Sequence, residues 1–326
     1  MLCIKDSHTD PYFNLAADEY VLKNFEEDCF MLWRNDPSVI VGKHQNTLAE
    51  INVDFVNNNN IKVVRRISGG GAVFHDLGNL NFSFIMSGHE GNLIDFRKFT
   101  NPILEALLTM GIEGKFEGRN DLTIDGMKFS GNAEHIWKNR TLHHGTLLFS
   151  AGISDLSAAL KTDPFKFTGK AVKSIRSRVT NISSYLKEKM TVIEFRDRIM
   201  DYILQKYPDS KIYEYTVEDI SGIEKLRDEK FTQWEWNFGY SPKYDFEKKV
   251  QTKGGILEFR LNVEKGLIKD FKVYGDFIHK NDIDIFEQSI IGMKHDYNTI
   301  LSSLSMLKFD HYFRDIEKEE FVGGMF

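Results

Sequence analysis

Three consecutive glycines, Gly69 to Gly71, constrain this chain more than any other feature of its sequence. They lie between two apolar runs in the stretch RRISGGGAVFHDLGNLNFSF, which spans residues 65–84. Each glycine weakens a helix or strand by about 0.5–1 kcal/mol relative to alanine. The triplet therefore predicts a strand–turn–strand whose bare backbone lets a ligand or a phosphate approach closely, with a plain flexible turn as the alternative.

The composition limits the class of protein in which this turn occurs. The 326 residues are 41% hydrophobic, which allows a large core, and the net charge of -6 argues against a nucleic-acid-wrapping surface. No apolar run reaches the roughly 18 residues of a membrane span. The only cysteines are Cys3 and Cys29, so no disulfide framework is expected. We therefore predict a soluble, cytoplasmic protein that binds neither nucleic acid nor a membrane.

Hydrophobic periodicity predicts an α+β fold with a large mixed, antiparallel-leaning sheet. Asp10 and Pro11 form an N-cap and first-turn pattern, so a helix of about four turns should follow them. Helices are also expected over 93–111, where Pro102 should start a new segment, and over 191–207. Strands are expected over residues 29–34, 38–43, 61–67, 72–76, 79–86, 122–125, 127–131, 134–139 and 141–150.

The pattern changes after residue 246. Residues 254–276 alternate apolar and polar side chains around Glu264-Lys265-Gly266, which is typical of a β-hairpin. Helical patterns follow over 281–292 and 297–307. We therefore predict a large domain over 1–246 and a small α+β C-terminal domain over 247–326.

The glycine triplet does not match two familiar nucleotide-binding motifs. A dinucleotide fingerprint needs glycine or alanine where this chain has Phe74, and the chain continues there as a strand. A P-loop is excluded because Ala171 follows Gly169-Lys170, and Pro164 stands where the first glycine belongs.

Polar residues on both sides of the triplet favour a ligand over a plain turn. Arg65 and Arg66 enter the turn from a strand, where a guanidinium can bind a phosphate, and Ser68 adds a hydroxyl. His75-Asp76 and Gly78-Asn79 follow the apolar Ala-Val-Phe run. Paired arginines more often form a solvated face, but that face does not ordinarily adjoin three glycines.

A second group of polar residues lies in the segment 118–149. Asn120 and Asp121 could coordinate Mg²⁺ or a ribose, although an ordinary turn deserves equal weight. Lys128 is our candidate for chemistry, because its small neighbours leave space around an otherwise solvated side chain. His143 and His144 should point to opposite faces of a strand, which disfavours zinc, and His144 more plausibly lines a pocket.

Four ordered motifs resemble those of the bacterial lipoate–protein ligase A family, in the biotin and lipoate ligase superfamily. They are the glycine stretch at 65–84, GRNDLTIDGMKFSGNA at 118–133, HHGTLLF at 143–149 and SIRSRVTNI at 174–182. The similarity extends from the first helix to a small C-terminal domain after WNFGYSP at 236–242. A match in four ordered motifs argues against chance.

The resemblance implies a role for each site residue. The glycine turn would lie along the lipoyl chain and the adenylate phosphate, Asp121 beside the nucleotide and its Mg²⁺, and Lys128 at the mixed anhydride as the catalytic residue. The segment around Arg176 resembles the loop that orders over the adenylate. The expected substrate- and adenylate-binding residues are Arg66, Ser68, Gly69, Gly70, Gly71, Ala72, Val73, His75, Asn79, Asn120, Asp121, His144, Ser174, Arg176 and Arg178.

The chemistry that the resemblance implies has two steps. Lipoate attacks the α-phosphate of ATP, giving lipoyl-AMP and pyrophosphate, and the ε-amine of an acceptor lysine then displaces AMP. ATP and Mg²⁺ are therefore the expected cofactors, with lipoate as substrate. The expected partners are lipoyl domains of 2-oxoacid dehydrogenase E2 subunits, the glycine cleavage H protein, or both.

Three alternatives differ from an ATP-dependent ligase. Octanoyl and lipoyl transferases of the superfamily use a cysteine nucleophile, and no cysteine follows Cys29 here. Biotin ligase shares the fold, but its glycine- and arginine-rich biotin loop is absent from the sequence. A non-catalytic lipoyl- or nucleotide-binding protein would not need Asp121 and Lys128, which are both present.

Overall fold

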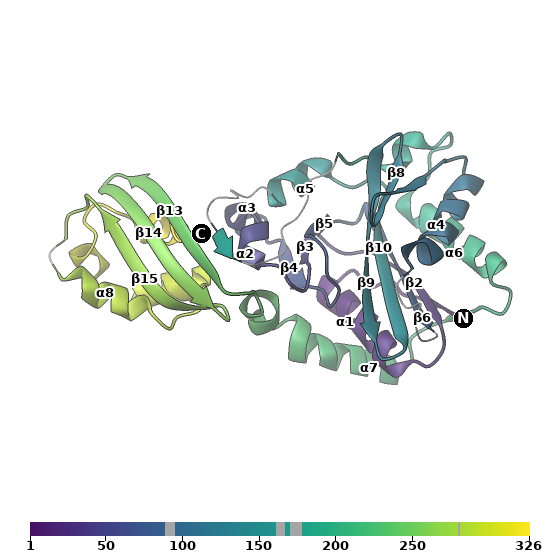
Figure 1. The fold of residues 1–326 in the computed structure, drawn as a ribbon, viewed down its shortest axis with the longest axis horizontal. Coiled ribbons are helices and arrows are strands. Elements are labelled where there is room, and N and C mark those ends of the chain that lie inside the picture. Colours follow the sequence, from purple (N-terminus) through teal and green to yellow (C-terminus); the bar gives the residue numbers. More distant parts are fainter. Residues whose placement is uncertain (89–94, 161–166, 170–177, 280) are drawn as a thin grey trace. The chain divides into compact units, whose positions relative to one another are not determined.

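The computed structural model describes residues 1–88, 95–160, 167–169, 178–279 and 281–326 (Figure 1). The chain forms two compact units. The first contains residues 1–43, 61–158 and 174–233, and the second contains 44–60, 159–173 and 234–326. The boundary between residues 246 and 247 stays a prediction.

An eight-stranded mixed sheet forms the centre of the first unit. β1 (Leu2–Lys5) lies between β12 (Lys211–Tyr213) and β2 (Cys29–Trp33) and is parallel to both. The predicted α+β class with a large mixed sheet is confirmed. The antiparallel part continues from β2 through β6 (Asn79–Ser87), β10 (Arg140–Leu148), β9 (Met127–Trp137), β8 (Asp121–Ile124) and β7 (Lys115–Glu117).

The two faces of this sheet differ in polarity. α4 (Phe96–Thr109) and α6 (Val192–Lys206) pack apolar side chains onto one face, where Phe82 and Phe84 of β6 contribute to the core. α1 (Pro11–Asn24) lies on the other face, because it contacts Ser83, whose side chain alternates with those of its two phenylalanine neighbours. α7 (Val217–Leu226) packs against α1. The polar face is therefore the one beneath α1.

The helix predictions are confirmed with one correction. Asp10 caps α1 by accepting a hydrogen bond from the Tyr12 N–H (3.4 Å), and Thr191 forms a capping box on α6. Pro102 does not start a new segment but lies inside the continuous helix α4. A proline removes a hydrogen bond from the helix. Pro102 is buried, so its packing against neighbouring residues offsets that loss.

β9 replaces the two short strands predicted over 127–131 and 134–139. It is one strand of 11 residues that pairs with β8 at its beginning and with β10 beyond Gly131. The register shifts opposite Leu122 and Thr123, so that β9 holds one extra residue there. Such a bulge bends a strand without ending it. Beyond Gly131 the strand continues because Asn132 and Ala133 pair with Gly145 and His144 of β10.

A separate three-stranded sheet carries the glycine turn. β3 (Ser38–Val41) is the central strand, with β4 (Lys62–Arg65) parallel on one side and β5 (Val73–His75) antiparallel on the other. All three strands were predicted from the sequence. The short helix α5 (Ile153–Ala159) follows β10 in the chain.

The second unit contains an antiparallel sheet in the order β11 (Phe167–Gly169), β13 (Tyr244–Thr252), β14 (Gly255–Glu264) and β15 (Leu267–Gly275). The predicted hairpin is confirmed, because Lys265 and Gly266 both have positive φ (52° and 72°) between β14 and β15. Its helices are α2 (Thr47–Glu50), α3 (Val53–Asn58), α8 (Ile283–Ile290), α9 (Tyr297–Leu304) and α10 (Lys318–Gly323).

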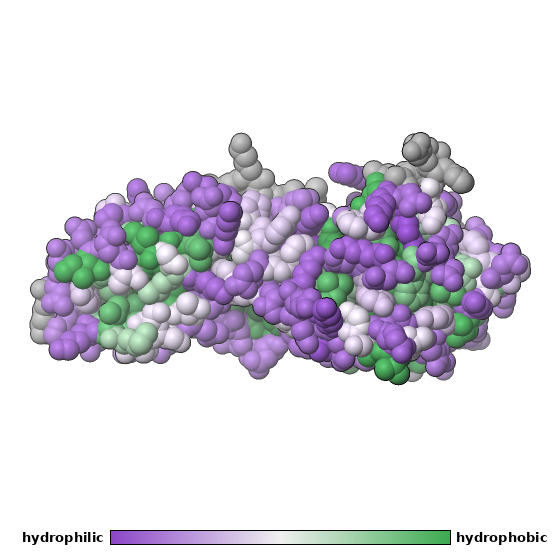
Figure 2. All heavy atoms as spheres, turned by 90° about the horizontal axis from the view of Figure 1, so that it is seen from below, coloured by the Kyte–Doolittle hydropathy of each residue, from purple (hydrophilic) through white to green (hydrophobic). Residues whose placement is uncertain are grey.

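The surface is mainly hydrophilic on the face drawn in Figure 2, with small hydrophobic patches. The exposed large apolar side chains are distributed over many elements rather than gathered on one, and include Leu108 of α4, Val217 of α7 and Ile285 of α8. Scattered exposure of this kind is normal for folded proteins. Among the described residues, no helix is both long and apolar enough to cross a membrane.

Candidate active site

The glycine turn crosses the end of the small sheet. It leaves β4 after Arg65 and enters β5 at Val73, and these two strands lie on opposite sides of β3. Gly70 has a φ of +92°, a conformation that only glycine adopts readily. A Cβ atom on Gly42, directly after β3, would lie 2.1 Å from the Gly70 carbonyl oxygen. The crossing therefore requires glycine at position 70 and at position 42. Of these two, Gly42 had not been identified from the sequence.

Arg66 fixes the conformation of this turn through hydrogen bonds to backbone carbonyl groups. Its Nη2 atom donates to the carbonyl oxygens of Gly69 (2.6 Å) and Gly71 (2.8 Å), and its Nη1 atom donates to that of Ile40 (3.2 Å). Burial lowers the pKa of Arg66 to about 10, so the guanidinium stays charged at neutral pH. Arg66 thus organises the turn through its backbone, and a contact of its guanidinium with a phosphate stays a prediction.

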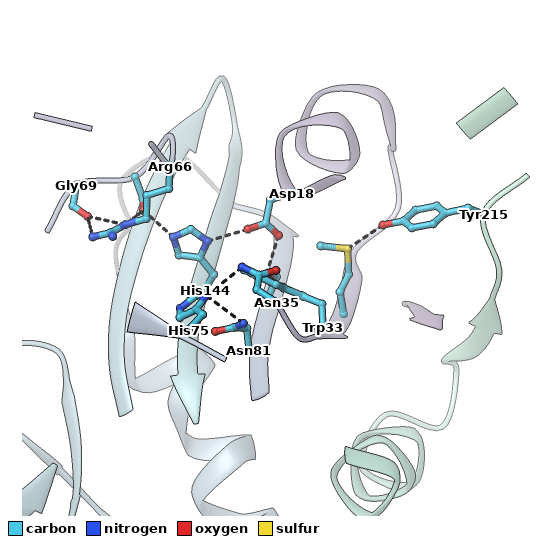
Figure 3. A network of polar contacts seen from close by, with 12 residues as sticks. Asp18, Trp33, Asn35, Arg66, Gly69, His75, Asn81, His144 and Tyr215 are labelled. Carbon is cyan, nitrogen blue, oxygen red and sulfur yellow. Dashed lines mark hydrogen bonds and ion pairs between the residues drawn. The ribbon is translucent and has the colours of Figure 1, made fainter. Parts of the chain in front are cut away.

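A line of hydrogen bonds connects the turn to α1 (Figure 3). Arg66 Nε donates to Ser68 Oγ (3.0 Å), and Ser68 Oγ lies 2.6 Å from His144 Nε2. His144 Nδ1 lies 2.8 Å from Asp18 Oδ2. All four side chains are buried, including the Asp18 carboxylate in the middle of a helix. The structure thus brings together three predicted site residues and adds Asp18.

The line continues beyond Asp18 into the large sheet. Ser83 Oγ of β6 donates to Asp18 Oδ1 (2.7 Å), and Trp33 Nε1 of β2 donates to Ser83 Oγ (3.0 Å). Both carboxylate oxygens of Asp18 are therefore hydrogen-bonded, as a buried charge requires.

His75 is held as a neutral imidazole. Burial lowers its pKa to about 3, and the positive charge of Arg66 adds to that effect. The Nδ2 atom of Asn35 lies 3.1 Å from His75 Nδ1, and that of Asn81 lies 3.5 Å from it. Asn35 must donate to His75, because its own Oδ1 accepts from Asn14. The ring proton of His75 is therefore on Nε2.

Two buried polar atoms, one on β5 and one at the start of β6, have no hydrogen-bond partner in the described part of the chain. Within the described residues, Nε2 of His75 and Oδ1 of Asn79 make no hydrogen bond, although Asn79 Nδ2 donates to Asn81 Oδ1 (2.8 Å). Native proteins leave few buried polar atoms unpaired, and each such atom needs an explanation. The pair offers a bound molecule one donor and one acceptor. Ala72 and Val73 lie half-buried just before them in the chain.

The second group of predicted residues lies on β8 and β9. Lys128 Nζ forms an ion pair with Asp121 Oδ1 (2.8 Å), with side chains 25% and 30% exposed. The pairing of β8 with β9 places Asp121 opposite Gly131, where its carboxylate meets the Lys128 ammonium. A Cβ atom on Gly131 would lie 3.1 Å from Lys128 Cε and Nζ. The lysine therefore lies over Gly131, as its small neighbours had suggested.

Backbone hydrogen bonds place Arg178 beside Lys128. The Lys128 N–H donates to the Arg178 carbonyl (2.9 Å), and the Thr180 N–H donates to the Lys128 carbonyl (2.9 Å). Asn120 uses its side chain to hold the hairpin, since its Nδ2 donates to the Asn132 carbonyl (2.6 Å). Ser174 and Arg176 lie outside the described residues.

His143 and His144 point to opposite faces, as predicted. His143 lies among the core residues, stacked on Phe99, with Glu134 Oε1 2.9 Å from its Nδ1. In the described part of the chain, no cluster of three or more His, Cys, Asp or Glu residues could hold a metal ion.

Sequence reasoning missed Asp18, Asn35 and Asn81. A signal for Asp18 was present, because Asn14 and Asp18 are four residues apart and both are buried on α1. Two polar residues at that spacing within a run of buried apolar residues mark a polar stripe on a helix. Asn35 follows a strand in a turn sequence, where an asparagine carries no such signal.

The chain is similar to known proteins along nearly all of its length. Residues 10–204 match the model of the lipoyl protein ligase A/B catalytic domain, and residues 241–324 match that of the bacterial lipoate protein ligase C-terminus. It is 42% identical over 318 residues to lipoate–protein ligase 1 of Staphylococcus aureus, covering 96% of both chains. It is also 42% identical to a lipoate-protein ligase of Bacillus subtilis, again over 96% of both.

Solved structures share the fold. A P. falciparum protein in complex with lipoate superposes with a TM-score of 0.64 and 27% identity, over 94% of both chains. A lipoate-protein ligase A bound with ATP gives a TM-score of 0.63 and 25% identity, over 73% of this chain and 98% of that one. A bipartite lipoate protein ligase of Thermoplasma acidophilum, described with its E2 lipoyl domain, gives a TM-score of 0.64 and 26% identity, over 73% of this chain and 96% of that one.

Proposed function

Because this chain belongs to the lipoate–protein ligase family, we propose that it activates lipoate with ATP and transfers the lipoyl group to a lysine of an acceptor lipoyl domain. The observation that carries the mechanism is the placement of Lys128 over Gly131, in contact with Asp121 and beside the backbone of Arg178. A cation held in this way is suited to stabilise charge that develops on a phosphate or a carbonyl oxygen.

The proposed reaction has two displacements. A carboxylate oxygen of lipoate attacks the α-phosphorus of ATP, and the bond to pyrophosphate breaks to leave lipoyl-AMP. The acceptor ε-ammonium loses a proton, and the neutral amine then attacks the lipoyl carbonyl. AMP leaves with the electrons of the anhydride bond, and the nitrogen releases a second proton to solvent as the amide forms. Lys128 would donate to the oxygens on which negative charge grows in both steps. At a separation of 4 Å, one such charge pair is worth about 4 kcal/mol at an effective dielectric of about 20.

The glycine turn is the proposed cradle for the lipoyl carboxylate and the adenylate phosphate. The backbone of Ser68 to Val73 would contact these two ligand groups. His75 would add a buried donor and Asn79 a buried acceptor. His144 supports the turn through Ser68. We retain Ser174, Arg176 and Arg178 as proposed adenylate-binding residues, with Arg178 joined to Lys128 by backbone hydrogen bonds.

Magnesium fits this site in part. Mg²⁺ is commonly bound by one or two carboxylates together with substrate phosphates. Asp121 offers a partly exposed carboxylate, of which Oδ1 binds Lys128. We propose that Asp121, with the phosphates of ATP and near Asn120, would hold the ion, which would supply further neutralisation of phosphate charge.

A thiol-dependent transferase is less compatible with the two cysteines. Cys3 lies on β1 and Cys29 on β2, and both are buried and free. Burial raises the pKa of the Cys29 thiol to about 12, which disfavours the thiolate that a nucleophile requires. These two cysteines also support the proposed cytoplasmic location, where free thiols persist.

The acceptors that we propose are the lipoyl domains of 2-oxoacid dehydrogenase E2 subunits, the glycine cleavage H protein, or both. All of the proposed site residues fall within 1–246, so we assign chemistry to that part and an accessory role to 247–326. Incubation of the protein with ATP, Mg²⁺, lipoate and a lipoyl domain should add one lipoyl mass to one lysine of the acceptor. ATP–pyrophosphate exchange that depends on lipoate should accompany it. Absence of both reactions would contradict the proposal, and transfer without ATP would favour a transferase.

A further inference from the structure

The geometry points to Asp18 as a positioning residue of the active site, which acts on the glycine turn through His144, Ser68 and Arg66. No sequence motif included it, and within the described residues its carboxylate is hydrogen-bonded to His144 and Ser83. The inference rests on the proposed function, because the turn is the segment that we propose to bind lipoate and its adenylate. It deepens that proposal by naming what holds the turn in place.

The direction of every hydrogen bond in the line follows from Asp18. An ionised carboxylate only accepts hydrogen bonds, so His144 must carry its proton on Nδ1, 2.8 Å from Asp18 Oδ2. In a neutral imidazole the Nε2 atom is then an acceptor, and the Ser68 hydroxyl donates to it over 2.6 Å. A guanidinium only donates, so Ser68 Oγ accepts from Arg66 Nε (3.0 Å). Each group then has one consistent role as donor or acceptor. A change of the His144 tautomer would reverse the direction of its two hydrogen bonds, to Asp18 and to Ser68.

The other end of the line is fixed by the large sheet. Asp18 Oδ1 accepts from Ser83 Oγ, which accepts from Trp33 Nε1. The Asp18 side chain is 2% exposed. It is therefore held at both carboxylate oxygens and shielded from water. The tautomer of His144 is set before any substrate binds.

Arg66 connects this line of hydrogen bonds to the backbone of the turn. It draws the carbonyls of Gly69 and Gly71 toward its Nη2 atom. In a trans peptide the N–H points opposite to the C=O, and the described residues contain no cis peptide bond. The N–H of Gly70 therefore points away from the guanidinium, on the exposed side of the turn. A backbone N–H in this setting is a donor for a carboxylate or phosphate oxygen.

The same three residue types form the triads of serine hydrolases, but the arrangement here suits support rather than attack. Ser68 is fully buried, and its oxygen already accepts a hydrogen bond from Arg66. A nucleophile needs an accessible oxygen with a lone pair directed at the substrate. We therefore assign positioning, and hydrolysis of lipoyl-AMP by Ser68 is an outcome that the experiment below excludes or reveals.

Asp18→Asn tests the inference, because it keeps the volume and removes the charge. Glu19→Gln is the matched control. Glu19 is the next residue of α1 and is also buried, but its carboxylate binds Lys23 (2.6 Å) and Lys230 (2.6 Å) and has no link to His144. Long-range ¹H–¹⁵N NMR of the free protein reports the tautomer of His144, whose signals are assigned by their loss in His144→Gln. ATP–pyrophosphate exchange gives kcat and the KM for lipoate.

We expect wild type and Glu19→Gln to show the Nδ1–H tautomer of His144 and similar KM values. Asp18→Asn should populate the Nε2–H tautomer and raise the lipoate KM about 10- to 100-fold, the scale on which removal of a partner behind a ligand-holding histidine acts in metal sites. A wild-type tautomer and KM in Asp18→Asn would overturn the inference, as would an equal effect of Glu19→Gln. Release of lipoate and AMP by wild type without an acceptor, lost in Ser68→Ala, would instead indicate the hydrolase role.

A second variant keeps the test decisive if Asp18→Asn does not fold. Ser68→Ala breaks the same line nearer to the turn and should raise the lipoate KM similarly while His144 keeps its Nδ1–H tautomer. In a folded double variant the two effects should not multiply, because both break one line. An unchanged KM in Ser68→Ala would refute the relay. Lack of lipoate-dependent exchange in wild type would refute the proposed function alone, since the NMR measurement needs no substrate.

Discussion

The ammonium of Lys128 lies 2.8 Å from the carboxylate of Asp121, across the hairpin between β8 and β9. Both side chains are about one-quarter to one-third exposed. An ion pair at that exposure contributes only about 0–1 kcal/mol to folding. The pair is therefore better explained as a device that holds the lysine over Gly131 than as a source of stability.

Lys128→Ala should lower lipoyl-AMP formation by at least about 10²-fold, the scale for loss of one preorganised donor. Its unfolding midpoint in urea should stay close to wild type. Lys62→Ala is the matched control, because Lys62 forms a similar pair with Asp10 (2.9 Å; side chains 41% and 31% exposed). Single-turnover formation of lipoyl-AMP measures the effect. Normal adenylation by Lys128→Ala would remove Lys128 from the catalytic site.

Gly70→Ala should destabilise the protein more than Gly69→Ala. Gly70 has a positive φ, and a Cβ atom there would lie 2.9 Å from Arg66 Nη2, whereas a Cβ atom on Gly69 would meet no atom within 4 Å. An alanine forced into that region costs on the order of 1–2 kcal/mol. Urea unfolding of both variants tests this difference. Equal stabilities would mean that Arg66 moves aside at little cost.

Acid should destabilise the wild type partly through His75. Burial lowers its pKa to about 3 from the 6.5 of an unfolded histidine, so between these values the unfolded state binds one more proton than the native state. The stability that neutral His75 contributes is full above pH 6.5 and falls as the pH falls, by up to about 1.4 kcal/mol per pH unit. Urea unfolding at pH 7 and pH 5 should show a smaller loss in His75→Asn. A loss in His75→Asn as large as that in wild type would contradict this assignment.

Glu134→Gln should become more stable relative to wild type as the pH rises. Burial, reinforced by Asp95, raises the pKa of Glu134 to about 7, and the neighbouring His143 is kept neutral by its own burial. The stabilising, protonated form of Glu134 is therefore present below its unfolded value near 4.5 and is lost as the pH rises through 7. Unfolding at pH 5 and pH 8 compares the two proteins. Glu105→Gln should show no such trend. The hydrogen bond with Lys206 lowers the pKa of Glu105, so any pH dependence of stability from this residue falls below pH 5.

The sequence alone determined most of the elements and the family. Cap residues and periodicity at Asp10 and Thr191 identified α1 and α6, because these signals are local. The glycine turn was recognisable because consecutive glycines conflict with both strand and helix. Two predictions were wrong, namely that Pro102 starts a new helical segment and that β9 is divided after Gly131. Pro102 is buried within the continuous helix α4, and β9 continues because its second half pairs with β10. The sequence drew attention to Lys128 through its small neighbours, and its side chain does lie over Gly131. Its catalytic role stays a prediction.

Only the tertiary structure decided what each site residue touches. Asp121 faces Lys128 because two strands pair, and Asp18 reaches His144 although 126 residues separate them in the chain. Arg66 seemed suited to bind a phosphate by its position in the sequence, and that contact stays a prediction. The structure shows that its guanidinium donates to the carbonyls of Gly69 and Gly71 in the turn and to that of Ile40 in β3. Local patterns report backbone preferences, which act between near neighbours. The partner of a buried polar side chain depends on which distant segments fold against it, and it has to be found there because leaving that side chain unpaired costs about 1–3 kcal/mol.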